Sequence, residues 1–269
     1  MRCVEYSRRA SPPPPPGSKM HSVHARFHAP DAREPGQVIT LAADEAAHLT
    51  RVLRLKVGAT VRVFDGAGLE YNGLVEKTSK HAADIRLLTR HQAAPEPRMR
   101  VTLAQAVLKG DKMDDVVRDA VMMGVAAILP LITARSEVSH AVLERGRRRE
   151  RWQRIAVMSA KQCGRAVVPA VLEPVAFSRL CTTTGVERDQ ALMLVEPSAG
   201  TNASTLSSLE PPAGSSMLVV VGPEGGWSAE EIGAAAGVLG PVTLKAPTLR
   251  ADAMPVAALA ALFARWGEW

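Results

Sequence analysis

The distribution of apolar and polar residues divides the chain into two parts with different periodicities. From about residue 21 to residue 92, short runs of alternating apolar and polar residues are separated by glycine-containing turns such as Asp65–Gly68. This alternation is typical of strands with one buried face, and it predicts a small β-barrel or curled sheet. The elements expected here are strands at Val23–Phe27, Gly36–Leu41, Thr60–Phe64, Glu70–Glu76 and Ala83–Leu88, and a short helix at Asp44–Leu55.

Strands alternate with helices over residues 99–269, after a proline-containing stretch at residues 93–98 that we interpret as a linker. The strands are almost continuously apolar, as a sheet buried on both faces requires. This pattern predicts an α/β domain with a mostly parallel sheet. The expected strands are 101–107, 126–132, 191–195, 216–221 and 242–244, and the expected helices are 111–123, 141–163, 228–239 and 254–266.

The first 20 residues read as an appendage to these two parts. Five consecutive prolines, Pro12–Pro16, remove backbone donors and hold the chain extended, so this segment cannot join a sheet or a helix. A second methionine, Met20, follows closely. We therefore expect residues 1–20 to be a disordered extension, or the product of a misplaced start codon.

Charge and cysteine usage narrow the class of protein. Lys and Arg outnumber Asp and Glu by 33 to 27, and this surplus of +6 favours an anionic partner only weakly. The cysteines Cys3, Cys163 and Cys181 form no Cys-x-x-Cys pair, which argues against a disulfide framework and a structural zinc site. No apolar run approaches the roughly 20 residues that span a bilayer. We expect a cytoplasmic protein with no metal site and no membrane span.

The loops after three predicted strands carry the strongest functional signal. Val221–Gly226 lies between a buried strand and a capped helix, and Val195–Gly200 and Leu244–Arg250 follow two further strands. Ligands of parallel sheets bind outside the carboxyl ends of the strands, so these loops predict a binding site. None of them has the Gly-x-Gly-x-x-Gly or P-loop pattern, which argues against a dinucleotide site and a nucleotide triphosphate site.

These loops, together with other short motifs, resemble a known family. Gly222–Ser228, followed by Leu249-Arg250 before the last helix, resembles the SPOUT class of knotted methyltransferases. Further matches narrow the resemblance to methyltransferases that act on N3 of a uridine in 16S ribosomal RNA. They are Lys109–Met113, Arg135-Ser136, Gln162–Arg165, His48–Arg54 and Asp65-Gly66. The resemblance covers the chain from about residue 23 to its end.

The resemblance implies a fold, a cofactor and an assembly. It implies a PUA-like RNA-binding β-barrel over residues 21–92, and a SPOUT methyltransferase domain over residues 99–269 with a C-terminal trefoil knot. It also implies a homodimer that binds S-adenosylmethionine in the knot. The cofactor contacts carried over by position are Leu194, Val195, Glu196, Val221, Gly222, Pro223, Glu224, Gly225, Gly226, Leu244, Lys245, Ala246 and Leu249.

The chemistry implied for the site needs a cation and an RNA-binding surface. Methylation of N3 removes an imide proton, and a cation near the uracil oxygens stabilises the resulting anion. Arg250 and Arg165 are the catalytic candidates, although a phosphate or dimer contact explains either arginine equally well. Glu224 is expected to brace its turn rather than to accept the proton. For 16S ribosomal RNA, the expected contacts are Arg26, His48, Arg51, Arg54, Lys109, Lys112 and Arg135.

One departure from the family pattern keeps alternatives open. Where the family has Leu-Arg-Thr-Glu-Thr-Ala, this chain has Leu249-Arg-Ala-Asp-Ala-Met254, so the carboxylate is shortened at Asp252 and two hydroxyls are missing. A related methyltransferase that acts on tRNA or on a ribose 2′-oxygen is one alternative. A non-catalytic RNA-binding assembly factor is another.

Tryptophans such as Trp227 are expected to pack in the core or at a dimer interface.

Overall fold

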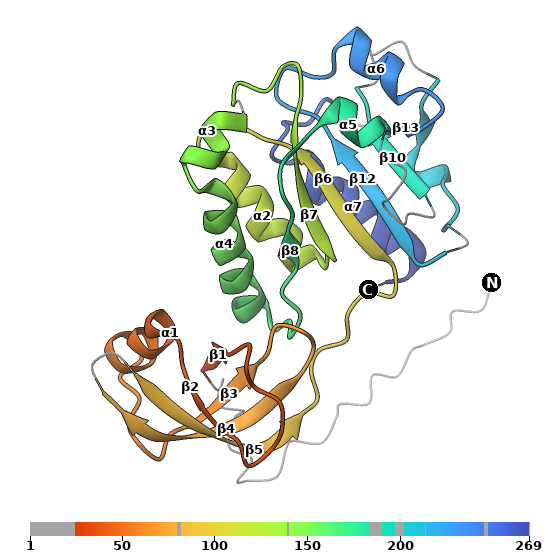
Figure 1. Ribbon diagram of the computed structural model, residues 1–269. Coiled ribbons are helices and arrows are strands. Elements are labelled where there is room, and N and C mark those ends of the chain that lie inside the picture. The colour runs from red at the N-terminus through yellow and green to blue at the C-terminus, as the bar shows by residue number, and fades with distance from the viewer. Residues whose placement is uncertain are drawn as a thin grey trace, which may run out of the picture.

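The computed structural model describes residues 25–79, 82–138, 140–182, 190–196, 202–212, 214–244 and 247–268. These residues form an N-terminal domain built on a curled sheet and a larger α/β domain, which lie on either side of a short connection (Figure 1). The predicted extension at residues 1–20 lies outside the described residues.

The N-terminal domain is a five-stranded sheet in the order β1-β3-β4-β5-β2. All neighbouring strands are antiparallel except β1 and β3, and register shifts in the β4–β5 ladder add to the curl of the sheet. Its core contains Phe27, Val63 and Tyr71, which are fully buried. The strands confirm the predicted curled sheet and are β1 (Arg26–His28), β2 (Val38–Thr40), β3 (Thr60–Phe64), β4 (Glu70–Thr78) and β5 (Ala83–His91).

The helix predicted at 44–55 is shorter and irregular. An α-helical turn, α1 (Ala43–Ala47), continues directly into a π-helical turn, η1 (His48–Val52). The N–H of Leu53 bonds to the carbonyl of His48, five residues back, which widens the turn. Arg54 then takes a positive φ of 52°, so the chain leaves the helix here.

The α/β domain has an eight-stranded sheet in the order β11-β13-β10-β12-β6-β7-β8, with β9 also paired to β7. Every pairing in this sheet is parallel, which confirms the prediction of a mostly parallel sheet. Three strands of two residues each, β8, β9 and β11, had no counterpart in the sequence pattern, and β13 begins and ends earlier than the predicted strand 242–244. The strands are β6 (Arg100–Ala106), β7 (Ala127–Ile132), β8 (Ala170–Val171), β9 (Val175–Ala176), β10 (Gln190–Leu194), β11 (Ser204–Thr205), β12 (Ser216–Val221) and β13 (Gly240–Thr243).

Helices cover both faces of this sheet (Figure 1). One face packs against α2 (Lys112–Met123), α4 (Arg148–Cys163) and α7 (Met254–Trp266). The other packs against α5 (Phe177–Thr182) and α6 (Ala229–Ala235), with Phe177, Leu180 and Ala235 in the shared core.

The helix boundaries correct two predictions. The helix predicted at 141–163 is two helices, α3 (His140–Arg145) and α4, because Arg147 between them adopts a positive φ of 45°. The helix predicted at 228–239 is capped by Ser228 through a capping box with Glu231, but it ends at Ala235, just before Gly237 takes a φ of 75°. The trefoil knot stays a prediction of the resemblance.

Candidate functional site

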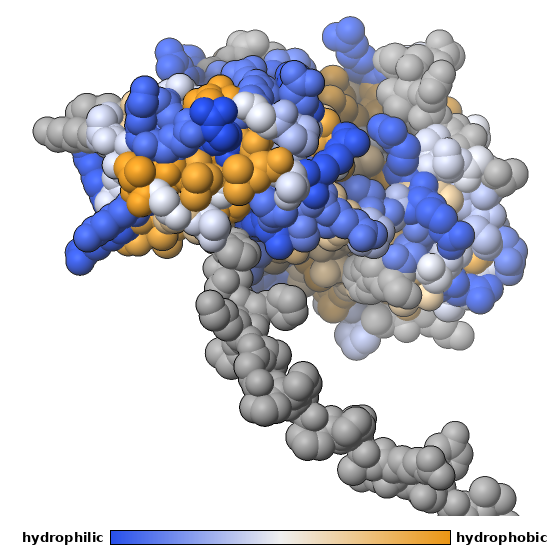
Figure 2. Space-filling view, turned by 90° about the horizontal axis from the view of Figure 1, so that it is seen from below, coloured by the Kyte–Doolittle hydropathy of each residue, from blue (hydrophilic) through white to orange (hydrophobic). Residues whose placement is uncertain are grey.

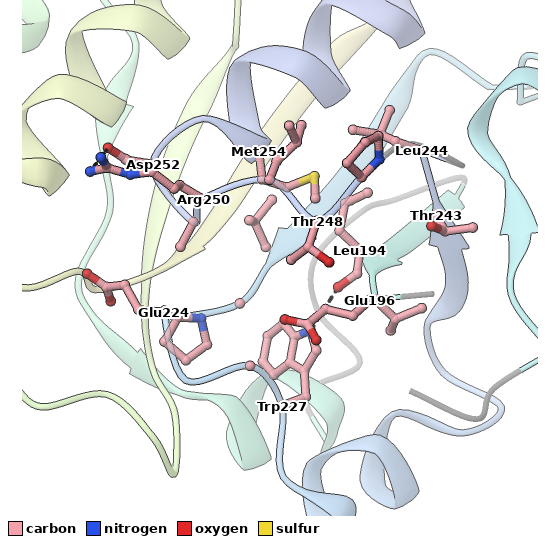
Figure 3. Close-up of a pocket in the computed structure, with 18 of the residues that line it drawn as sticks. Leu194, Glu196, Glu224, Trp227, Thr243, Leu244, Thr248, Arg250, Asp252 and Met254 are labelled. Carbon is pink, nitrogen blue, oxygen red and sulfur yellow. Dashed lines mark hydrogen bonds and ion pairs between the residues drawn. The ribbon is translucent and has the colours of Figure 1, made fainter. Parts of the chain in front are cut away.

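The carboxyl ends of β10, β12 and β13 form a cavity of about 320 Å³. These strands are neighbours in the order β13-β10-β12, and because they are parallel their carboxyl ends meet at one edge of the sheet. Figure 3 shows the side chains that converge there. The lining residues are Lys112, Leu194, Val195, Glu196, Val221, Gly222, Pro223, Glu224, Gly226, Trp227, Thr243, Leu244, Pro247, Thr248, Leu249, Arg250, Ala251, Asp252 and Met254.

The glycine loop after β12 depends on the absence of side chains at two positions. A Cβ atom on Gly222 would lie 2.9 Å from a ring carbon of Trp227, closer than real contacts allow. Gly226 has a φ of 67°, a conformation that residues with a side chain rarely adopt. The loop can therefore fold back closely on the wall of the cavity only with glycine at both positions.

Trp227 forms part of that wall. Its indole N–H donates to the carbonyl of Leu194 at 2.8 Å, so it ties the end of β12 to the end of β10. Its ring packs against Phe177 with a centroid separation of 4.8 Å. Trp227 thus belongs to the core, as predicted, but it also lines the cavity, which the prediction missed. Its place directly after two loop glycines was the available signal.

The cavity has a charged end and a less polar end (Figure 3). Arg250, Asp252 and Glu224 lie together at one end, while Thr243 and Leu244 lie at the other. Between them, Glu196, Thr248 and the thioether of Met254 point toward the middle of the cavity. Such a site can hold a ligand that has both a flat apolar part and polar groups.

Two ion pairs form the charged end. Arg250 donates from Nε and Nη2 to the two carboxylate oxygens of Asp252, at 3.0 and 2.9 Å. Lys112, at the start of α2, donates from Nζ to Glu224 at 2.9 Å. Burial raises the pKa of both carboxyl groups, but hydrogen bonds from Arg250 to Asp252, from Lys112 to Glu224 and from nearby backbone N–H groups outweigh it and leave each pKa lowered. Both carboxylates are therefore ionised at neutral pH.

Most of the predicted cofactor contacts lie around this cavity. Gly225 does not line it, and Lys245 and Ala246 lie outside the described residues. Residues that line the cavity but were absent from the predicted cofactor set include Thr243 and Thr248 from the strand end and loop after β13, and Met254 from the start of α7. The predicted residues that line the cavity are Leu194, Val195, Glu196, Val221, Gly222, Pro223, Glu224, Gly226, Leu244 and Leu249.

Of the two catalytic candidates, only Arg250 reaches the cavity. The expectation that Arg165 lies near the pocket is wrong. Its side chain is 9% exposed, and it donates to Glu96 and to the carbonyls of Val121 and Val125. These contacts tie the connection between the domains to the end of α2. The side chain of Arg165 therefore stabilises the structure and does not reach the cavity.

Arg26 needs a similar correction. It was expected to contact RNA, but its side chain is only 14% exposed and its donors bond to Glu70 and to the C-terminal end of α4. A guanidinium with all of its donors engaged inside the protein cannot also bind a phosphate. Arg26 lies between the domains rather than on an RNA-binding face.

Three of the other predicted RNA contacts lie on the N-terminal domain. Arg51 and Arg54 are exposed at the end of η1, and His48 at its start is partly buried against Phe27. Seen from below, the N-terminal domain also presents apolar side chains bordered by hydrophilic ones (Figure 2), and its exposed apolar residues include Val52.

Lys109, Lys112 and Arg135 lie beside the glycine loop instead. Lys109 pairs with Glu137 at 2.8 Å, and this hydrogen bond raises the pKa of the lysine. Arg135 donates to the carbonyl of Gly225 at 2.7 Å. The structure therefore separates the predicted RNA contacts into a group on the N-terminal domain and a group around the cavity mouth.

Neither a metal-binding cluster nor a membrane-spanning helix is present among the described residues. They hold no group of three or more His, Cys, Asp or Glu side chains arranged to bind a metal ion. None of the helices formed by those residues is long and apolar enough to cross a membrane.

Two family models match the chain. The model described as an RNA methyltransferase domain matches residues 94–263, and the model described as an RNA methyltransferase PUA domain matches residues 41–88. The first contains all three loops of the cavity, and the second covers most of the curled sheet. The boundary between the two matches falls in the connection between the domains.

Curated relatives and a solved structure are similar over most of the chain. Ribosomal RNA small subunit methyltransferase E from Synechocystis is 32% identical, and the alignment covers 82% of this chain and 71% of that protein. The protein of the same name from Bacillus subtilis is 28% identical, with coverages of 74% and 78%. A crystal structure of ribosomal RNA small subunit methyltransferase E from Neisseria gonorrhoeae, bound to S-adenosylmethionine, superposes with a TM-score of 0.81. It is 30% identical and covers 90% of this chain and 98% of its own.

Proposed function

This chain belongs to the ribosomal RNA small subunit methyltransferase E family, and on that premise we propose that it methylates N3 of a specific uridine in 16S ribosomal RNA. The coarser statement, an RNA methyltransferase that uses S-adenosylmethionine, follows from the family. The finer statement is that the methylated base is uracil and the methylated atom is N3. It rests on the charged end of the cavity and on the motifs that resemble the N3-methylating family. A cytoplasmic location fits this substrate.

The residues of the cavity fit S-adenosylmethionine. Gly222 and Gly226 let the loop backbone line the cavity without side chains of its own at these positions, and Leu194, Leu244 and Met254 offer apolar contacts for a flat adenine ring. Glu196 points into the middle of the cavity, where its carboxylate can accept hydrogen bonds from the ribose hydroxyls. When bound, the cofactor supplies an electrophilic methyl group on its sulfonium.

Arg250 is the residue that we assign to the chemistry of the base. It lines the charged end of the cavity, and its side chain is 73% exposed, so its remaining donors can reach an incoming ligand. Loss of the N3 proton places negative charge on the uracil oxygens. A guanidinium at these oxygens stabilises that charge and lowers the pKa of the imide. Asp252 holds the guanidinium through the hydrogen bonds that it accepts from Nε and Nη2.

Three carboxylates line the cavity, and we assign one of them, Glu196, to the ribose hydroxyls rather than to the N3 proton. Asp252 and Glu224 have lowered pKa values because each accepts hydrogen bonds from a cation, so both are weak bases at neutral pH. We therefore propose that they orient Arg250 and Lys112, and that the proton leaves to solvent through the open charged end.

RNA binding is proposed for two basic surfaces. His48, Arg51 and Arg54 on the N-terminal domain would contact the RNA away from the target base, and Lys109 and Arg135 would contact phosphates beside the cavity. Because phosphate neutralisation releases counterions, the affinity for 16S ribosomal RNA should fall on the order of a thousandfold over a modest salt increase if six or more contacts form. A titration of RNA binding against salt concentration measures this slope, and a flat slope would remove RNA as the partner.

We also propose that the protein acts as a homodimer, as the family resemblance implies. Light scattering coupled to size-exclusion chromatography measures the mass directly, and twice 28.7 kDa is expected. A mass of 28.7 kDa at micromolar concentration would contradict the dimer.

The decisive experiment is mass spectrometry of nucleosides from 16S ribosomal RNA of cells with and without this protein. Loss of 3-methyluridine in its absence, and its return when purified protein and S-adenosylmethionine are added to unmodified small subunits, is the expected result. Appearance of a 2′-O-methylated nucleoside instead, or a product only on tRNA, would replace the proposal by the corresponding related activity.

A further inference from the structure

The two domains meet at a buried ionic joint that neither catalysis nor cofactor binding uses. We define the joint as Arg26 and Glu70 of the N-terminal domain together with residues 160–168 at the end of α4 and beyond it. Glu70 has a side chain only 4% exposed, and Arg26 donates to both of its carboxylate oxygens at 3.0 and 3.1 Å. Arg26 also lies over the ring of Phe64, 4.6 Å from its centre.

The remaining donors of Arg26 cross to the other domain. Its Nη1 atom donates to the carbonyls of Ala160 and Lys161, and its Nη2 atom donates to the carbonyl of Arg165. The first two carbonyls belong to the last turn of α4, where they carry the negative end of the helix dipole. With the two bonds to Glu70, these contacts use all five N–H donors of a guanidinium. The N-terminal domain therefore supplies the C-terminal cap of a helix in the methyltransferase domain.

Neighbouring contacts make this joint rigid. Lys161 donates to Glu45 at 2.7 Å and lies over the ring of Phe27, so α4 also reaches into the N-terminal domain. Backbone bonds join the two domains as well: the N–H of Val168 donates to the carbonyl of Gly66 at 2.9 Å. A joint with buried charges and backbone bonds on both sides has one preferred geometry, because any rotation leaves buried polar groups without partners.

The joint lies at the opposite edge of the parallel sheet from the cavity. Its contacts involve residues that precede strands, such as Arg165 and Val168 before β8, whereas the cavity is lined by residues that follow β10, β12 and β13. Because all of these strands are parallel, the two edges are separated by the strand length. For the seven residues of β6 that is roughly 20 Å. Figure 1 shows the N-terminal domain beneath the end of α4.

From this arrangement we propose that the Arg26–Glu70 pair is a positioning element that sets the distance between the RNA-binding domain and the cavity, and thereby selects which uridine is methylated. The proposal rests on the proposed function, because it needs RNA to be bound by the N-terminal domain. RNA held there reaches the cavity only at a fixed offset along its structure. A joint that can rotate would present other nucleotides, or none, to the methyl group.

The test uses the double variant Arg26→Met with Glu70→Gln in the full-length protein. Removing both charges avoids leaving the Glu70 carboxylate buried with only the longer contact from Arg62, at 3.8 Å, and Arg62 is itself partly exposed, so the variant should still fold. The matched control is Arg86→Met with Glu76→Gln, an arginine–glutamate pair of the same domain that is far more exposed and lies away from the joint. Transfer of tritium from labelled S-adenosylmethionine to small subunits measures the rate without regard to which atom is methylated.

The expected result separates positioning from binding. In the joint variant the transfer rate at saturating RNA should fall on the order of a hundredfold, because a misplacement of about 1 Å has that effect. Its affinities for S-adenosylmethionine and for small subunits should stay within twofold of wild type, and fragment mapping should find methyl groups at additional nucleotides. Small-angle X-ray scattering should show a larger maximum dimension. The control variant should match wild type in all of these measurements.

Two results would overturn the positioning role. One is a folded joint variant with wild-type rate and product. The other is a joint variant whose scattering curve is unchanged. If the double variant does not fold, Arg26→Lys serves instead: it keeps the charge beside Glu70 but has fewer donors for α4, and the same two results decide. Failure of the proposed function looks different, since wild-type protein would then transfer no methyl group to RNA while the scattering comparison would stand.

Discussion

The joint between the domains and the mouth of the cavity use the same chemical group in opposite ways. At the joint, the side chains of Arg26 and Arg165 are 14% and 9% exposed and bond to carboxylates and to backbone carbonyls. At the cavity mouth, Arg250 is 73% exposed and bonds to Asp252 alone among the described residues. A saturated, buried guanidinium fixes structure. An exposed one with spare donors can turn to an incoming anion.

This difference separates stability from chemistry. Removing one partner of a buried ion pair leaves an uncompensated charge and costs several kcal/mol, whereas an exposed pair contributes about 0–1 kcal/mol. Arginine substitutions at the two regions should therefore differ most in their effect on the free energy of unfolding.

Arg250→Met should lower kcat by about 100- to 1000-fold, corresponding to about 2.7–4 kcal/mol, because it removes the cation that stabilises the uracil anion. Its free energy of unfolding should change by less than about 1 kcal/mol, since its only described partner is a carboxylate at the surface. Single-turnover methyl transfer and urea denaturation measure the two quantities. Wild-type turnover at saturating substrate would end the assignment of Arg250.

Arg165→Met should lower the free energy of unfolding much more than Arg250→Met does. The substitution leaves Glu96 and the carbonyls of Val121 and Val125 without their donor, so the free energy of unfolding should fall by about 3 kcal/mol. This is the low end of the range for buried pairs, because Glu96 is partly exposed. Urea denaturation measures the loss. A loss below 1 kcal/mol would mean that burial of a guanidinium does not mark a structural role in this chain.

The sequence predicted the elements well wherever local patterns determine them. The alternation at Thr60–Phe64 and the apolar run at Ser216–Val221 both became strands with those bounds, because burial on one or two faces sets such patterns. The two-residue strands had no such pattern. Their pairing depends on neighbours far along the chain, as when Ala170 pairs with Ala127.

For the site, the sequence predicted loops better than side chains. The glycine loop at 222–226 lies at the cavity because its position between a buried strand and a capped helix is a local property. The roles of Arg26 and Arg165 are not local. Their partners Glu70 and Glu96 are 44 and 69 residues away, so a basic residue in a motif looks the same whether it will meet RNA or a buried carboxylate.

Gly222→Ala tests the shape of the cavity wall, because it adds a methyl group there without changing any charge. The added Cβ would lie 2.9 Å from Trp227, so the wall must shift and the affinity for S-adenosylmethionine should fall by roughly 10- to 100-fold. Isothermal titration calorimetry measures the dissociation constant. The matched control is Gly233→Ala in α6, where a Cβ meets nothing within 4 Å and affinity should be unchanged. Equal affinities for the two variants would contradict the tight approach of the loop to Trp227.

The smallest expected effect is a pH dependence at the joint side of the N-terminal domain. Burial lowers the pKa of His28, and the nearby carboxylates of Glu45, Asp65 and Asp44 offset this only in part. The unfolded chain therefore takes up a proton more readily than the folded protein. Stability is complete above the ordinary histidine pKa of about 6.5 and decreases as the pH falls through it.

Because His28 lies beside Gly66 and packs against the ring of Phe64, protonation acts directly on the contacts of the joint. The melting temperature should fall by about a few degrees between pH 7.5 and pH 5.5. His48, whose pKa is also lowered by burial and by Lys161, should contribute in the same direction. Replacing His28 by Gln removes one titrating group, so scanning calorimetry of His28→Gln should show a shallower dependence on pH. An unchanged slope would mean that protonation of His28 does not affect the stability of the protein.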